Sequence, residues 1–232
     1  MKVFKMTVLS FALVASAGSL SAMAAETAQI TVKGAVIPAA CSISVDGSAD
    51  FGNLADSAQP RQAKNHMAYH LGYKLISFNI QCDSTVKAAL YAQADNLPTA
   101  QSPFGVTNYI SEIKKTIRTD NGQIASLGLL DDQDMGYFIT MLASATLDGE
   151  SAELMFSKDN GVHWNAVTEL DDHVLYQDGS VLHSWGSGIT PQEATNISGV
   201  IKISAAIDPK VVDELKDAVN FNTGTTLSLQ YL

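Results

Sequence analysis

Short runs in which apolar and polar residues alternate dominate the chain, and this period of two is typical of half-buried β-strands. The clearest run is the last, from Gly224 to Leu232, where Leu227, Leu229 and Tyr231 share one face and polar residues occupy the other. A strand that runs to the end of a chain is either well paired or an edge that awaits a partner. The pattern predicts a terminal strand whose pairing is central to function.

A second amphipathic strand is predicted near the other end, over residues 29–36. Its apolar face comprises Ile30, Val32, Gly34 and Val36. Pro38 cannot donate a ladder hydrogen bond and separates this segment from the next strand, which begins at Cys41 and ends before a turn at Asp46 and Gly47. Each end of the chain is therefore expected to carry a lone strand.

The middle of the chain is expected to alternate between strands and loops. Further strands are predicted over residues 72–82, 86–94, 136–147, 152–156, 162–167, 174–176 and 199–207. The first two are separated by a turn only, which predicts a hairpin between them. Residues 57–69, 96–135 and 179–188 lack regular alternation and are expected to be loops, the long central one with a helical turn at Ile110, Ile113 and Ile117.

Near the carboxyl terminus, Asp208 followed by Pro209 predicts the start of a short helix that delivers the chain to its last strand. About ten short strands separated by turns favour an all-β fold. The expected architecture is an immunoglobulin-like antiparallel β-sandwich with one short helix in its carboxyl-terminal region.

Residues 1–24 have the features of a secretory signal. Lys2 and Lys5 precede an apolar run, and Ala22-Met23-Ala24 provides a cleavage site. The run is too short for a bilayer core and no later segment is apolar enough, so no membrane span is expected in the mature chain. The predicted organisation is a signal over residues 1–24, an extension over 25–37 and one sandwich domain over 38–232.

The charge balance argues against a nucleic-acid partner. The chain has 14 Lys and Arg against 24 Asp and Glu, a net charge of -10 that becomes -12 when Lys2 and Lys5 leave with the signal. There is no G-x-S-x-G, H-E-x-x-H, P-loop or dinucleotide glycine pattern. No enzyme activity and no cofactor are therefore predicted.

The two cysteines, Cys41 and Cys82, are expected to form a disulfide because an even count in an exported chain is normally oxidised. Metal binding or thiol redox chemistry would require C-x-x-C or clustered histidines, which neither cysteine has. His66 and His70 are four residues apart, but no third ligand is near them in sequence, so no metal site is predicted.

Residues 157–164 match S-x-D-x-G-x-x-W through Ser157, Asp159, Gly161 and Trp164. The motif resembles the Asp-box of sialidase propellers, where it stabilises a hairpin by side-chain bonds to turn amides and takes no part in catalysis. A single copy without a blade-sized repeat predicts a structural hairpin. A sialidase-like hydrolase is the enzyme alternative. Trp164, in the predicted hairpin, and Trp185, in a predicted loop, support a second alternative, a self-complete carbohydrate-binding protein or tip adhesin.

The ends of the chain resemble chaperone-usher fimbrial subunits. The resemblance rests on the signal, an apolar strand before Ala39-Ala40-Cys41, a second cysteine closing Phe78-Asn-Ile-Gln-Cys82, and a final alternating strand with tyrosine next to last. It implies that Cys41 and Cys82 bridge the first two sandwich strands. It also implies a sandwich that lacks one strand until a partner supplies it.

The same resemblance implies the partners: a periplasmic chaperone, an usher and neighbouring subunits, with passage through the periplasm to a surface fimbrium. A host or surface glycan is a further candidate partner. Ile30, Val32, Gly34 and Val36 would belong to the donor strand. The residues that would face the chaperone's strand are Leu227, Leu229, Tyr231 and Leu232.

Overall fold

The computed structural model describes residues 40–52, 61–63, 66–101, 103–108, 115–117, 122–213 and 220–232. The predicted signal over residues 1–24 and the donor residues Ile30, Val32, Gly34 and Val36 lie outside the described residues, as do Ile110 and Ile113 of the predicted helical turn.

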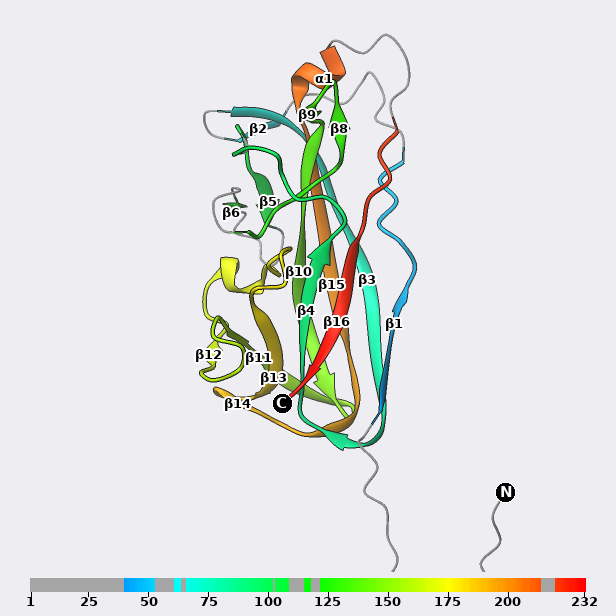
Figure 1. Ribbon diagram of the computed structural model, residues 1–232, viewed down its shortest axis with the longest axis vertical. Helices are drawn as coiled ribbons and strands as arrows, with labels where there is room; N and C mark the ends of the chain where they lie inside the picture. The colour runs from blue at the N-terminus through cyan, green and yellow to red at the C-terminus, as the bar shows by residue number, and fades with distance from the viewer. Residues whose placement is uncertain are drawn as a thin grey trace, which may run out of the picture. The chain divides into compact units, whose positions relative to one another are not determined.

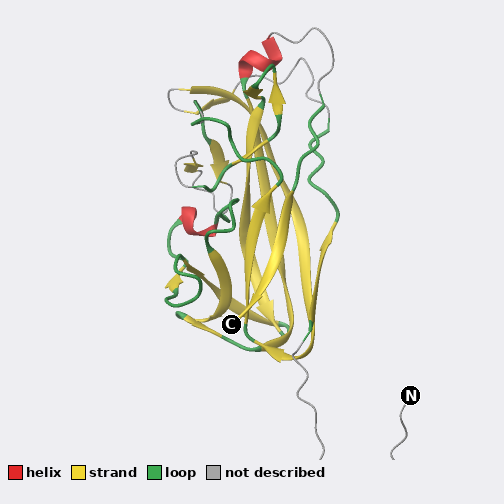
Figure 2. Cartoon of the chain, viewed as in Figure 1, coloured by secondary structure: helices red, strands yellow, loops and turns green. Residues whose placement is uncertain are grey.

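The main strands form one antiparallel path that folds into two layers (Figures 1 and 2). The order is β1-β3-β15-β10-β11-β13-β4-β16. One layer contains β1 (Cys41–Asp46), β3 (His66–Val86), β15 (Ala194–Ile207) and β10 (Gly136–Leu147). The other contains β11 (Glu150–Ser157), β13 (Leu182–Ser187), β4 (Ala88–Ala94) and β16 (Thr225–Tyr231). The predicted all-β antiparallel sandwich is confirmed.

Shorter elements flank these layers. β2 (Arg61–Ala63), β7 (Ala125–Ser126), β12 (Asn165–Ala166) and β14 (Thr190–Pro191) pair with β3, β10, β11 and β13 in that order. Two separate pairs are β5 (Val106–Asn108) with β6 (Lys115–Ile117), and β8 (Leu129–Leu130) with β9 (Gln133–Asp134). Among the described residues, the helices are η2 (Leu170–His173) and α1 (Pro209–Asp213). Within the described ranges, neither helix has the length and apolarity needed to cross a membrane.

Alternation decides which face of each strand is buried. On β3, Phe78 and Ile80 are buried whereas Leu75 is 58% exposed. The Phe78 ring lies 6.3 Å from the ring of Trp185, which is fully buried on β13, so the two layers meet at this aromatic pair. Gly199 on β15 permits this packing, because a Cβ atom there would lie 2.6 Å from the Phe78 ring.

The predicted hairpin between residues 72–82 and 86–94 is wrong. β3 pairs with β1, β2 and β15, whereas β4 pairs with β13 and β16, so the chain passes from one layer to the other at Lys87. Alternation shows which side chains of a strand face the core. The same side chains of β3 and β4 are buried whether the two strands pair with each other or lie in different layers. The partner of each strand is set by the tertiary fold.

The predicted surface loop over residues 96–135 is also wrong in its described part. Phe104, Val106 and Ile124 are buried with Tyr137 and Met141 in a second apolar cluster. The local strands are two or three residues long, too short to show a period.

Four smaller expectations differ from the structure. The segment 57–69, expected to be a loop, contains β2 and the start of β3. The segment 179–188 contains strand β13 and is not a loop throughout, and the strand expected over 162–167 is reduced to β12. Val174, in the segment expected to form a strand over 174–176, makes an isolated bridge to Met141. The predicted helix after Asp208 is present as α1.

Candidate functional site

The first and last strands of the path, β1 and β16, each pair on one side only within the described residues. β1 pairs with β3 and β16 pairs with β4. The opposite edge of each strand presents backbone N–H and C=O groups that a further strand can use. The path is therefore open between these two edges (Figure 1).

The open edges are held together at one end. Cys41 and Cys82 lie directly opposite each other in the β1–β3 ladder and form the predicted disulfide, with their Cα atoms 4.0 Å apart. The Cys41 N–H donates to the Tyr231 hydroxyl at 2.9 Å. The backbone N–H of the next residue, Leu232, donates to the Lys87 carbonyl at 3.0 Å. These bonds fix the start of β1 beside the end of β16.

A groove of about 190 Å³ lies between β1 and β16. Ile43, Ser44 and Val45 of β1 form one wall, and Thr225 and Leu227 of β16 form the other. Val45 is 49% exposed although it lies in an ordered strand. Apolar side chains beside open strand edges are typical of a surface that a partner covers.

The floor of the groove is the inner face of the first layer. Its residues are Ile76 of β3, Thr140 of β10, and Ile201 and Ile203 of β15. Three of these four side chains are aliphatic, so the floor favours the apolar face of an incoming segment. These residues were not among the sequence-predicted site residues, because the sequence does not reveal that β10 and β15 lie beneath the gap between β1 and β16.

The predicted residues of the terminal strand fall at the edge of the core. Leu227 and Leu229 are half-buried and pack against the main apolar cluster, which includes Leu90 and Trp185. Tyr231 and Leu232 are 50% and 44% exposed. Of this set, Leu227 lines the groove and Tyr231 is bonded to the first strand.

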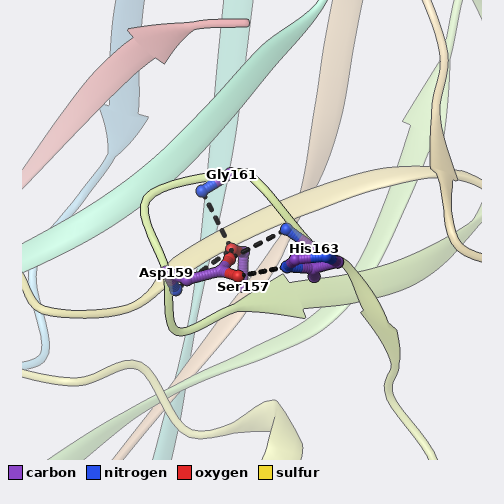
Figure 3. A network of polar contacts seen from close by, with 4 residues as sticks. All are labelled: Ser157, Asp159, Gly161 and His163. Atoms are coloured by element: carbon purple, nitrogen blue, oxygen red, sulfur yellow. Dashed lines mark hydrogen bonds and ion pairs between the residues drawn. The ribbon is translucent and has the colours of Figure 1, made fainter.

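The Asp-box-like residues form a compact polar network at the end of β11 (Figure 3). The Ser157 hydroxyl donates to Asp159 Oδ1 at 2.7 Å and accepts the Gly161 N–H at 2.9 Å. The His163 N–H donates to Asp159 Oδ1 at 2.9 Å, and His163 Nδ1 lies 2.6 Å from Asp159 Oδ2. The His163 backbone bond, followed by the His163 and Ser157 side chains, lowers the pKa of Asp159 to about 2.

The two tryptophans have different environments. Trp164 follows the polar network and is half-buried. Trp185 is fully buried beside Phe78, so it cannot stack on a sugar in this conformation. The two side chains therefore do not form a shared aromatic platform.

A second, smaller cavity of about 150 Å³ lies between η2, β11 and β13. Its lining includes Lys158, Tyr176 and the buried His183. His183 Nε2 lies 3.1 Å from the Asp172 carbonyl oxygen, and burial lowers the pKa of His183 to about 4. Lys158 Nζ lies 5.7 Å from the centroid of the Tyr176 ring. No group of three potential metal-ligating side chains occurs in the described ranges.

Comparison with known proteins gives two similarities. Residues 30–135 match the model of a family described as "Protein of unknown function (DUF1120)". The chain is 24% identical over 245 residues to Protein GltF of Escherichia coli (strain K12), and the match covers 94% of each chain. No solved structure matches the chain. The family match includes both cysteines and β1 but ends before β16, so the similarity to this family covers one of the two walls of the groove.

Proposed function

We propose that the chain is an exported fimbrial or fimbrial-like structural subunit that binds its partners by β-strand complementation. A strand from another polypeptide would lie in the groove between β1 and β16 and pair with both edges. The partners would be a periplasmic chaperone during export, then an usher and neighbouring subunits, with a cell-surface fimbrium as the assembled form and a contribution to adhesion.

The groove is the observation that carries this proposal. An extended peptide that joins a sheet edge gains backbone hydrogen bonds along its length, and alternate side chains fill pockets that provide specificity. The groove supplies both requirements, two unpaired edges and an aliphatic floor. An isolated edge strand without an apolar floor would offer hydrogen bonds but little burial.

The amino-terminal extension is the proposed occupant within an assembly. As an extended strand, residues 25–36 would place Ile30, Val32, Gly34 and Val36 on one face, the alternation that an apolar groove requires. The extension precedes Cys41, at the end of the groove where β1 and β16 are bonded. In our proposal the extension of one subunit completes the groove of the next.

The carbohydrate-binding alternative loses part of its basis, because Trp185 is fully buried. The Ser157–Asp159 network fastens a hairpin through hydrogen bonds within the turn. We therefore retain strand complementation as the proposed function and propose no catalytic activity. Cleavage of a sialoside by the purified chain, lost on changing Asp159, would reverse this ranking.

Peptide binding tests the proposal. A fluorescent peptide copying residues 25–36 is titrated into the chain purified from a periplasm that lacks fimbrial chaperones. We expect saturable binding and an increase in melting temperature, because a ligand that binds only the folded state stabilises it. A matched control peptide carries serine at the positions of Ile30, Val32 and Val36 and should not bind.

Two observations together would contradict strand complementation. A chain that is abundant and monomeric without a chaperone, and whose melting temperature is unchanged by the peptide, would have a self-complete sandwich. Strand complementation would then be wrong for this protein.

A further inference from the structure

The Asp-box-like turn contacts the last strand of the chain. Asn160 Oδ1, in the turn, accepts a hydrogen bond from Gln230 Nε2 on β16 at 3.2 Å. At the next residue, Gly161, an added Cβ atom would lie 3.4 Å from Leu232 Cδ2, an ordinary contact distance. The bond joins residues 70 positions apart. The turn is therefore attached to one wall of the groove as well as closing its own hairpin.

The shape of the turn depends on the polar network shown in Figure 3. Asn160 and Gly161 have positive φ values of 59° and 87°. Asparagine adopts this left-handed region more readily than most residues, and glycine adopts it without strain. The Ser157 hydroxyl accepts the Gly161 N–H, and Asp159 Oδ1 accepts the His163 N–H. The network therefore holds in place the two residues that contact β16.

The last three residues of the chain are held from two sides. Gln230 and Leu232 contact the turn. Tyr231, between them, has its side chain on the other face of the strand and bonds to Cys41 at the end of the groove. Within the described residues β16 pairs with β4 only, and a strand end with one paired edge tends to fray. The contacts with the turn oppose this fraying.

We propose that the Asp-box-like turn braces the carboxyl end of β16 in the empty groove and so keeps this wall in the extended form that an incoming strand needs. This inference rests on the proposed function and gives residues 157–163 a positioning role in it. The turn lies against the side chains of β16 that face away from the groove, so it acts on the bound strand through β16.

The entropy of ordering explains how a turn outside the groove changes the affinity for a strand inside it. If residues 230–232 became ordered only when a partner arrived, the loss of conformational entropy would weaken binding. A wall that is already extended avoids this loss. Weakening the turn should therefore weaken strand binding even in a chain that remains fully folded.

Peptide affinity tests the brace. The dissociation constant of the peptide copying residues 25–36 is measured with Asp159→Ala, Asn160→Gly and Gln230→Ala, at a temperature at which each variant is folded. Glycine at position 160 allows the positive φ and removes only the carboxamide. The matched control is Thr226→Ala, an exposed position on the same face of β16 as Gln230.

We expect Asp159→Ala to weaken binding by about tenfold, and Asn160→Gly and Gln230→Ala by about threefold each. Thr226→Ala should bind like the wild type. Because Asn160 and Gln230 share one bond, their double variant should bind no more weakly than either single variant. Hydrogen exchange at the Leu232 amide, which is bonded to the Lys87 carbonyl, should be faster in the three turn variants without any peptide.

The failures of the two proposals are distinguishable. Unchanged affinity in the turn variants, with normal binding by the wild type, would overturn the brace and leave strand complementation intact. Faster exchange at Leu232 with unchanged affinity would also overturn it, because the turn would then serve stability alone. Absence of binding by the wild-type chain would overturn strand complementation and with it this inference. If Asp159→Ala folds poorly, the two milder variants decide the outcome.

Discussion

The backbone N–H of Cys41 donates a hydrogen bond to the side-chain hydroxyl of Tyr231, a residue 190 positions further along the chain. Cys41 is also bonded through its sulfur to Cys82, which lies opposite it on β3. The start of β1 is therefore held on both sides, by a covalent bond to its own layer and by a hydrogen bond to the last strand. This joint forms one end of the groove.

The Tyr231 hydroxyl should contribute to stability. Tyr231→Phe removes the acceptor for the Cys41 N–H and should lower the free energy of unfolding by about 1 kcal/mol. Urea denaturation measures the loss, and hydrogen exchange at the Cys41 amide should become faster. Tyr91→Phe on β4 is the matched control. Equal losses in both variants would show that the bond to Cys41 contributes nothing specific.

The Cys41–Cys82 disulfide should contribute more to stability than the Tyr231 hydroxyl does. The loop that it closes has a sequence separation of 41, and loss of a native disulfide from an exported domain typically costs about 2 to 5 kcal/mol. The variant Cys41→Ser with Cys82→Ser should fall in that range by urea denaturation. Alkylation of the unreduced wild-type chain should add no label. Labelling of both cysteines would contradict the bond.

The Asp159 network should weaken in acid. The pKa of Asp159 in the folded chain is about 2, below the ordinary value of 3.8, so the charged carboxylate stabilises the folded state above about pH 4. This contribution is lost as the pH falls from about 4 to about 2. At neutral pH Asp159→Asn should be less stable than the wild type, and the difference should shrink through that interval. Glu150→Gln, at an exposed carboxylate outside this network, is the matched control.

As the pH is lowered, His183 should reduce the free energy of unfolding at a higher pH than Asp159 does. Burial lowers its folded pKa from 6.5 to about 4, so the unfolded chain binds the proton first. Stability should decrease by about 3 kcal/mol as the pH falls from about 6.5 to about 4. His183→Gln should have a flatter profile in this interval, whatever its stability at neutral pH. Parallel profiles for the two proteins would show that another group takes up the proton.

A charge on the groove wall should block strand binding. Val45→Asp places a carboxylate where an incoming apolar side chain would cover it, and burying an unpaired charge is unfavourable. The affinity for the peptide of residues 25–36 should fall by at least about tenfold. Ser42→Asp is the matched control, since Ser42 is exposed on the same strand and does not line the groove. Similar affinities for both variants would place the peptide elsewhere.

The ends of the fold were predictable from local chemistry. The alternation of Leu227, Leu229 and Tyr231 predicts strand β16, and two cysteines permit a single pairing. Both predictions need only neighbouring residues or a count. The Ser157 turn is similarly local, because every bond in its network spans at most four positions.

The groove could not be predicted from the alternation of apolar and polar residues along the chain. Ile76 and Ile201 lie on strands with clear periods, yet their place beneath one gap depends on the order of β3, β15 and β10. Thr140 gave no sequence signal, because a threonine within an apolar strand is ordinary. Within the described part of the chain, the lack of a hydrogen-bond partner for Thr140 Oγ1 is visible only when the neighbours from other strands are in place.

The two ends of the sheet path border the same groove. In the proposed complementation, one added strand would pair with both edges at once, after which neither edge would have free backbone groups to offer. Occupancy would saturate at one strand for each chain. An assembly formed in this way grows by one subunit at a time as a single file, without branching, and a subunit whose groove is already filled takes up no second strand there.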